Sequence, residues 1–154
     1  MTLPKKTLVV KKSTIPNSGK GLFTKKFIRK GTRIVEYKGK VITWKEAERL
    51  ADSENGYVFH FTNNYCIDAR DTKKSVAGYV NDARGITRVD GLKNNTEYVT
   101  KKKQCFIDAT KNIPAGAELF VGYGAEYWKV IRYNARIDRE NALSAQKKRE
   151  LRKN

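Results

Sequence analysis

Glycine and proline occur only in the first 124 of the 154 residues, and this boundary constrains the fold more than any other feature. Before it, turn residues interrupt every β-prone run, so the strands there should be short. After Gly124 the chain contains neither residue and is rich in helix formers, which predicts a helix. We therefore expect a mostly β, β-rich α+β fold of short sheets with a helical C-terminal extension.

Local patterns place the other elements. Residues 43–46, Thr-Trp-Lys-Glu, have the spacing of a capping box and predict a short helix to about Ala51. Residues 75–80 should form one helical turn, and residues 82–95, rich in Gly, Asn and charge, should form a loop. Residues 63–64, Asn-Asn, are expected to form a hairpin turn. The expected strands are 7–11, 33–37, 40–42, 57–61, 65–69, 97–100, 104–109 and 119–123.

The net charge of +17 is concentrated at the two ends of the chain. Residues 1–40 carry +11 and residues 129–154 carry +6, whereas residues 41–128 are neutral overall. Basic ends favour an anionic partner such as nucleic acid, chromatin or an acidic protein face, or they serve solubility alone. Three interpretations of residues 133–154 stay open: a solvated helix, a tail that contacts nucleosomes or nucleic acid without reading bases, and a homodimer contact.

Several classes of protein are disfavoured. No run approaches the roughly 20 apolar residues of a spanning helix, so we expect no membrane contact. The two cysteines form no disulfide framework, which favours a reducing intracellular setting. His60 with Cys66 and Cys105 falls short of a zinc ligand set, so we expect no metal. Residues 19–21, Gly-Lys-Gly, lack the ending of a phosphate-binding Walker loop.

Three ordered stretches form a recognisable pattern. The first joins residues 15–23, which contain a Gly-x-Gly loop, to residues 31–39, which end in Tyr-x-Gly. The second is Gly78-Tyr-Val-Asn-Asp82, followed by Asn95-Thr-Glu-Tyr98. The third, residues 113–124, reads Ile-Pro-Ala-Gly-Ala-Glu-Leu-Phe-Val-Gly-Tyr-Gly. The ordered set resembles the SET domain of protein-lysine methyltransferases, whose fold is a β-clip with knot-like threading.

The resemblance also implies a domain organisation and an activity. Residues 123–128, Tyr-Gly-Ala-Glu-Tyr-Trp, are similar to small viral SET proteins without zinc-binding flanking modules. The resemblance implies three parts: a basic segment at residues 1–6, a SET domain at residues 7–128 and a basic helical extension at residues 129–154. The implied reaction is methyl transfer from S-adenosylmethionine to a lysine, with S-adenosylhomocysteine as product. The expected substrate is a histone, in the nucleus or on chromatin, or in the host nucleus if the source is a virus.

Two other functions stay open at this point. One is a catalytically silent SET-like module that binds chromatin or nucleic acid. It is favoured by two departures from the family pattern, Asp82 in place of the usual His and a longer loop at residues 83–94. The other is a methyltransferase of a non-histone protein. A basic enzyme repels a basic substrate, so Glu97 and Asp108 are candidate acids beside the substrate groove.

The implied chemistry needs alignment and exclusion of water rather than a nucleophile on the protein. Aromatic rings can surround the target amine, and tyrosine hydroxyls can orient it. The alternative interpretation is that the tyrosines and the tryptophan named below are core aromatics, and that Gly21 and Asn81 are ordinary turn residues. By resemblance, the catalytic residues are Tyr123, Tyr37 and Tyr98, and the substrate channel contains Tyr37, Tyr98, Tyr127 and Trp128. The cofactor-binding residues are Lys20, Gly21, Leu22, Asn81, Asp82, Tyr123 and Trp128.

Overall fold

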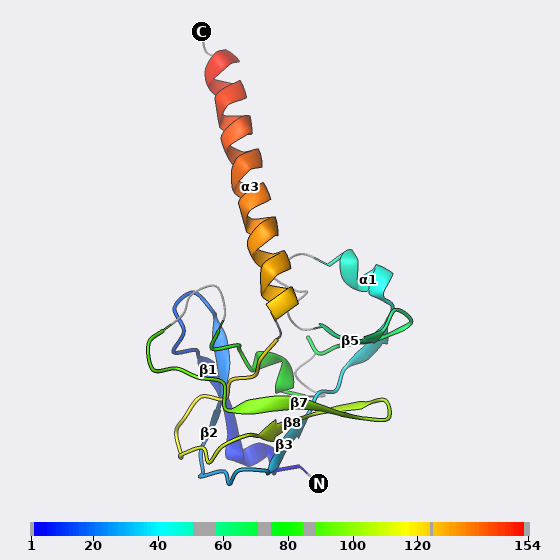
Figure 1. Cartoon of the computed structure of the whole chain (residues 1–154), viewed down its shortest axis with the longest axis vertical. Coiled ribbons are helices and arrows are strands. Elements are labelled where there is room, and N and C mark those ends of the chain that lie inside the picture. Colours follow the sequence, from blue (N-terminus) through cyan, green and yellow to red (C-terminus); the bar gives the residue numbers. More distant parts are fainter. Residues whose placement is uncertain (1, 51–57, 71–74, 85–88, 124, 153–154) are drawn as a thin grey trace. The chain divides into compact units, whose positions relative to one another are not determined.

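A computed structural model describes residues 2–50, 58–70, 75–84, 89–123 and 125–152, and for residues 125–138 it describes the backbone alone. The chain divides into two compact units, Met1–Gly122 and Tyr123–Asn154. The first unit contains short strands and the second consists mainly of one helix (Figure 1). The predicted mostly β fold with a helical C-terminus is therefore confirmed.

Three small antiparallel sheets make up the first unit. They have the strand orders β1-β2, β3-β8-β7 and β4-β6-β5. The strands are β1 (Leu8–Lys12), β2 (Lys20–Thr24), β3 (Arg33–Glu36), β4 (Lys40–Ile42), β5 (Val58–Thr62), β6 (Tyr65–Asp68), β7 (Thr96–Lys101) and β8 (Gln104–Ala109). The helices are η1 (Lys5–Thr7), α1 (Trp44–Glu48) and η2 (Ala77–Tyr79) in the first unit, and α3 (Ala125–Arg152) in the second.

The predicted helix cap at Thr43 and the predicted hairpin turn at residues 63–64 are both confirmed. Thr43 caps α1, because its hydroxyl accepts a hydrogen bond from the Glu46 backbone N–H at 3.2 Å. The Glu46 carboxylate accepts one from the Thr43 N–H at 3.4 Å, which completes the predicted capping box. The helix ends at Glu48, earlier than expected, and Ala51 lies outside the described residues. Thr62 pairs with Tyr65 across the predicted two-residue turn.

Two predictions of strands were wrong. No strand was expected at residues 20–24, yet they form β2, because pairing with β1 compensates for the weak strand propensity of glycine. The expected strand at 119–123 is absent: residues 118–121 make only isolated bridges with Phe23, Asn81 and Thr96. No single strand runs alongside this segment, so it bridges several neighbours without joining a sheet.

The largest fully buried side chains come from β2, β3, β8 and the segment that follows β8. Full burial of such a side chain contributes roughly 1.5–3 kcal/mol. The C-terminal part of the SET-like pattern therefore fills the core of the first unit. The residues are Leu22, Ile34, Ile107, Ile113, Leu119 and Val121, each at 0% exposure. Among the described residues no helix has an apolar stretch of the length that crossing a membrane requires.

Candidate active site

Asn81 joins two distant segments of the chain. Its side-chain Nδ2 donates a hydrogen bond to the Lys20 carbonyl at 3.0 Å. Its own carbonyl accepts one from the Val121 N–H at 2.9 Å, and its backbone pairs in parallel with Phe120. The structure therefore brings together the predicted residues Lys20 and Asn81 and the segment that leads to Tyr123. We call this meeting point of Lys20, Asn81 and residues 120–121 the Asn81 junction.

Asn95 holds the same segment from the other side. Its Oδ1 accepts a hydrogen bond from the Phe120 N–H at 2.8 Å, and its Nδ2 donates to the Glu118 carbonyl at 3.0 Å. The Thr96 hydroxyl donates to the Phe120 carbonyl at 2.8 Å. Residues 118–121 are thus held between Asn81 and Asn95. Asn95 was missing from the predicted site, although it opens the Asn-x-x-Tyr motif.

Glu118 forms a buried polar clamp, defined here as its carboxylate with Ser13, Thr14 and Asn81. The residue is 5% exposed. Its Oε2 accepts from the Ser13 hydroxyl at 2.7 Å and lies 3.5 Å from Asn81 Nδ2. Its Oε1 accepts from the Thr14 N–H at 2.8 Å and the Thr14 hydroxyl at 2.6 Å. These donors offset the cost of burying the charge. Sequence reasoning missed Glu118, although its motif position was quoted.

Gly21 makes room for this clamp. A Cβ atom at Gly21 would lie 2.2 Å from Glu118 Oε2 and 2.9 Å from its Cδ. The family resemblance placed Gly21 among the cofactor-binding residues. In the structure the Glu118 carboxylate occupies the space that a side chain at position 21 would fill. The clamp therefore requires a glycine at this position.

Replacing Gly21 with Ala should lower the free energy of unfolding by about 2–3 kcal/mol, because Glu118 is held by three hydrogen bonds from Ser13 and Thr14 and has little room to move. Urea unfolding would measure this loss. In a Glu118→Ala background the same Gly21→Ala change should cost much less, because the clashing carboxylate is gone. Equal costs in the two backgrounds would show that Gly21 and Glu118 are not coupled.

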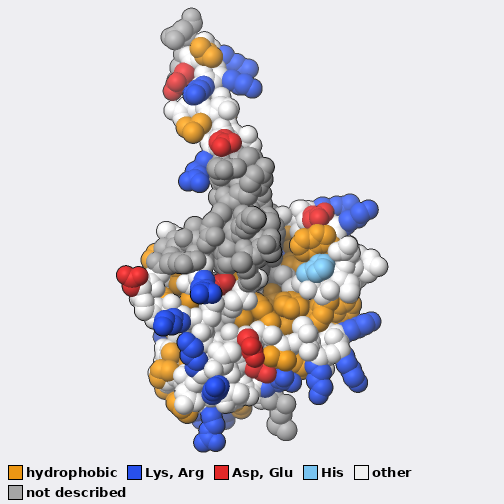
Figure 2. All heavy atoms as spheres, in the orientation of Figure 1, with side chains coloured by type: hydrophobic (Ala, Val, Ile, Leu, Met, Phe, Trp, Pro, Cys, Tyr) orange, Lys and Arg blue, Asp and Glu red, His pale blue; other side chains and the backbone are white. Residues whose placement is uncertain are grey.

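An aromatic cluster joins residues of β5 and β7 to the residue that follows β3. Tyr37, directly after β3, is 2% exposed and its ring centroid lies 6.1 Å from that of Tyr98 on β7. Phe59 on β5 contacts both, at 5.8 Å from Tyr37 and 5.0 Å from Tyr98. The structure therefore brings the predicted tyrosines Tyr37 and Tyr98 together and adds Phe59. Figure 2 shows hydrophobic side chains gathered on this face, beside the histidine.

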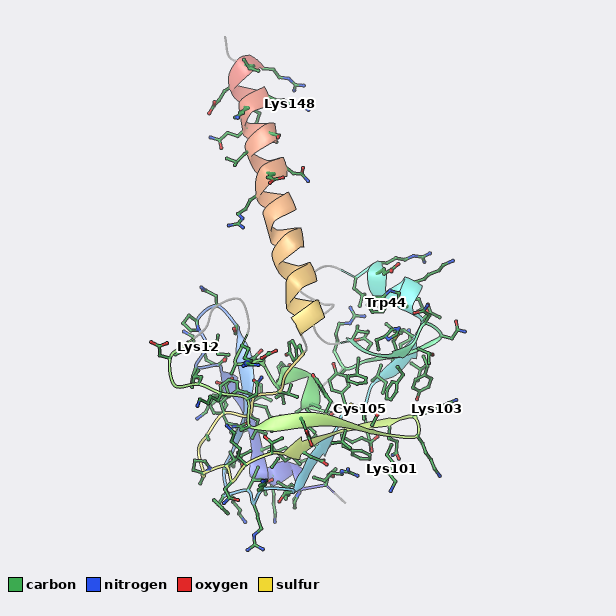
Figure 3. All side chains as sticks on the ribbon, in the orientation of Figure 1. Lys12, Trp44, Lys101, Lys103, Cys105 and Lys148 are labelled. Carbon is green, nitrogen blue, oxygen red and sulfur yellow. The ribbon has the colours of Figure 1, made fainter. Side chains whose placement is uncertain are left out.

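Further rings extend the cluster along β5 and β6. Phe61 lies 5.0 Å from Phe59 and 5.4 Å from Tyr65, between ring centroids. Trp44 on α1 packs edge-on against His60 at 5.0 Å (Figure 3). His60 Nε2 also lies 3.0 Å from Asn63 Oδ1 in the hairpin turn. These contacts give His60 a structural role at the β5-β6 hairpin.

Comparison with known proteins identifies the family of the chain that contains the Asn81 junction and the aromatic cluster. Residues 19–124 match the family model described as the SET domain. The chain belongs to the SET-domain family. It is 30% identical over 131 residues to a histone-lysine N-methyltransferase, EZH2, of Chaetomium thermophilum. The match covers 79% of this chain but 8% of that protein, so the chain spans less than a tenth of the relative's length.

A solved structure shares the fold of this SET domain. The methyltransferase domain of human PR domain-containing protein 2 superposes with a TM-score of 0.58 at 23% sequence identity. The superposition covers 80% of each chain. At this level of identity the likeness concerns the fold, which agrees with the β-clip architecture that the sequence motifs implied.

Asp82, the departure from the family's usual His, has a local structural role in this SET domain. It is 4% exposed, and its Oδ1 accepts hydrogen bonds from the Arg84 N–H at 2.8 Å and from Asn94 Nδ2 at 3.1 Å. Asn94 Oδ1 in turn accepts from the Ala83 N–H at 2.8 Å. Asp82 therefore closes the base of the longer loop at residues 83–94.

The expected acids beside the substrate groove are not at the tyrosine cluster. Glu97 and Asp108 are register partners across β7 and β8, whereas Tyr98 pairs with Ile107. Because side chains alternate along a strand, both acids lie on the opposite face of the sheet from Tyr98. Asp108 is also held by Arg33, whose Nε and Nη2 donate to it at 3.0 and 3.1 Å. The structure therefore does not bring these two acids to the tyrosine cluster.

The remaining predicted residues stay predictions. Leu22 is fully buried, and its carbonyl accepts a hydrogen bond from the Leu119 N–H at 2.8 Å. Tyr123 is partly buried and begins the second unit. Tyr127 and Trp128 lie on α3, but their side chains are outside the described residues.

The two cysteines are buried within the core. Cys66 and Cys105 are each at 0% exposure and free of disulfides. Burial, and secondly the charge of Glu36, raise the pKa of Cys105 to about 12. Burial also raises the pKa of Cys66. Within the described part of the chain, no three His, Cys, Asp or Glu side chains are grouped to bind a metal ion.

Proposed function

We propose that this SET domain is a protein-lysine N-methyltransferase that transfers a methyl group from S-adenosylmethionine to a lysine, with a histone as substrate. One observation carries the proposal: the Asn81 junction and the tyrosine cluster are adjacent along β7. Thr96 bridges Val121 at the junction, and Tyr98 lies two residues further on the same face of the strand. This separation is about 7 Å. A donor at the junction and an amine between the rings would therefore be neighbours.

Residues at the junction fit the amino-acid end of the donor, which carries a carboxylate and an ammonium group. Lys20 is exposed and makes no ion pair with any described residue. The Asn81 amide has a fixed orientation, because its Nδ2 faces the Lys20 carbonyl and the Glu118 carboxylate, two acceptors. Its Oδ1 accepts no hydrogen bond within the described ranges and can receive one from the ammonium. We propose further contacts from Leu22, the Asp82 backbone, Tyr123 and Trp128.

When bound, the donor supplies an electrophilic methyl group on a sulfonium. The protein must present the lysine amine unprotonated, which at neutral pH costs about 4–5 kcal/mol from its ordinary pKa. Tyr37, Phe59 and Tyr98 form an apolar wall that excludes water and disfavours the charged amine. The hydroxyls of Tyr37 and Tyr98 can orient the nitrogen. We assign Tyr123 to the reacting end, and Tyr127 and Trp128 to the outer end of the channel.

Titration calorimetry with S-adenosylhomocysteine tests donor binding directly. The protein should bind it, and Lys20→Met should weaken binding about fivefold by removing the partner of the carboxylate. Lys12→Met is a matched control, because Lys12 is an exposed lysine directly opposite Lys20 in the β1-β2 register. Equal weakening in both variants would mean that overall charge, and not Lys20, affects the ligand. No binding at high micromolar ligand would favour the silent module.

Substrate class is tested by labelled methyl transfer. The protein is incubated with a labelled donor and either purified histones or total cell lysate, and the products are read by mass spectrometry. Methyl label on histone lysines is the expected result. Label confined to other proteins of the lysate would replace the histone assignment with the non-histone alternative. Binding of S-adenosylhomocysteine without any incorporation would contradict the proposed activity.

A further inference from the structure

A strongly basic surface lies where three segments of the first unit meet. Residues 25–30 join β2 to β3 along the bottom of Figure 1, and Figure 2 shows Lys and Arg side chains at that border. The Lys25 N–H donates to the Thr7 carbonyl at 2.7 Å, which places η1 beside this segment. We define the basic surface as Lys5, Lys6, Lys25, Lys26, Phe27, Arg29, Lys30 and Lys111.

Backbone contacts fix the third segment, residues 111–113, beside residues 25–30. Ile28 and Ile113 exchange two hydrogen bonds, each at 2.8 Å, and the Lys30 N–H donates to Asn112 Oδ1 at 2.8 Å. Ile28 is 2% exposed and anchors the segment in the core. The seven cations of the basic surface therefore project from a backbone that is tied down on both sides.

Within the described part of the chain, no acidic side chain pairs with these cations. Residues 2–35 and 109–117 contain no Asp or Glu. Asp108, just before the third segment, is occupied by Arg33. None of the seven cations forms an ion pair with a described residue. Their mutual repulsion is relieved when an anionic polymer binds, which also releases the counterions of that polymer.

Phe27 identifies the kind of polymer. It is 60% exposed at the middle of the basic run, although a Phe side chain is normally buried. An exposed ring among cations can stack on an unpaired base while the cations contact phosphates. A duplex offers no free base face, and Phe27 alone is too little apolar surface for membrane insertion. We propose that the basic surface binds single-stranded nucleic acid.

The basic surface is separate from the candidate active site. Lys20 and Tyr37 lie at the far ends of β2 and β3, because β2 starts at Lys20 and β3 ends just before Tyr37. The segment 25–30 connects the opposite ends of the same two strands. A bound strand would therefore leave the tyrosine cluster free, and binding does not depend on the proposed methyl transfer.

Fluorescence anisotropy with labelled 20-nucleotide oligo(dT) and oligo(U) tests the proposal. The logarithm of affinity should fall with the logarithm of salt concentration, with a slope no steeper than about −5 for seven contacts. Phe27→Ala should weaken single-strand binding about fivefold or more. The same change should alter binding of a 20-base-pair duplex less than twofold, because Phe27 has no base to stack on there.

Paired charge variants locate the contact. Lys25→Gln with Lys26→Gln should reduce the salt slope by about 1 to 1.5. Lys147→Gln with Lys148→Gln on α3 removes the same charge from exposed positions of the second unit and should leave the slope unchanged. Equal losses from the two pairs would overturn the proposal, as would an unaffected Phe27→Ala variant. Binding to phosphatidylserine vesicles but not to oligonucleotides would assign the surface to membranes instead.

Discussion

Replacing Tyr123 with Phe should lower the rate of methyl transfer by about 100-fold and leave the free energy of unfolding nearly unchanged. The size of the effect follows from removing one hydroxyl that, in the proposed mechanism, acts at the reacting atoms. Tyr123 is only partly buried, so loss of the hydroxyl should cost little stability. Single-turnover transfer of a labelled methyl group measures the rate, and urea unfolding measures stability.

Tyr65→Phe is the matched control for this variant. The Tyr65 hydroxyl donates only a long hydrogen bond of 3.5 Å to the Lys103 carbonyl, at the edge of the aromatic cluster. Its removal should change the transfer rate less than twofold by the same assay. If Tyr123→Phe were as active as the unmodified protein, Tyr123 would have no place in the mechanism, and the family assignment of its role would fail for this chain.

Replacing Gly39 with Ala should destabilise the first unit by more than about 3 kcal/mol, above the usual cost of overpacking. A Cβ atom at Gly39 would lie 1.9 Å from the Asp68 carbonyl oxygen and 2.5 Å from its carbon. Both are backbone atoms of β6, which is paired on both sides, so they cannot move away as a side chain can. Urea unfolding and near-ultraviolet circular dichroism, which reports on Tyr37 and its neighbours, would measure the effect.

Gly122→Ala is the control for added volume. A Cβ atom at Gly122 has as its nearest neighbour Asn94 Nδ2 at 3.4 Å, an ordinary contact. This variant should stay within about 0.5 kcal/mol of the unmodified protein. If Gly39→Ala unfolds at the same urea concentration as Gly122→Ala, then β4 and β6 are less tightly paired than the structure indicates. The free energy of unfolding of a typical domain is about 5–15 kcal/mol. The loss expected for Gly39→Ala is a substantial fraction of this value, so urea unfolding should resolve it easily.

Local features of the sequence determined most of the secondary structure. The Thr43 capping box, the turn at residues 63–64 and the absence of Gly and Pro after Gly124 each depend on residues close together in the chain. They therefore specify the same local structure in many surroundings. The ordered motifs also indicated the SET-domain family and the nearness of Lys20 to Asn81, a contact the structure contains.

Only the tertiary structure decided how distant residues combine. Ser13 and Glu118 meet across 105 positions of sequence, and Gly21 must lack a side chain because of that contact. The face on which Glu97 and Asp108 lie depends on strand register, and β2 exists because β1 pairs with it. Residues 118–121 are bridged by several neighbours and so do not become a strand. Such contacts depend on which segments meet in space, and short-range patterns contain no information about that choice.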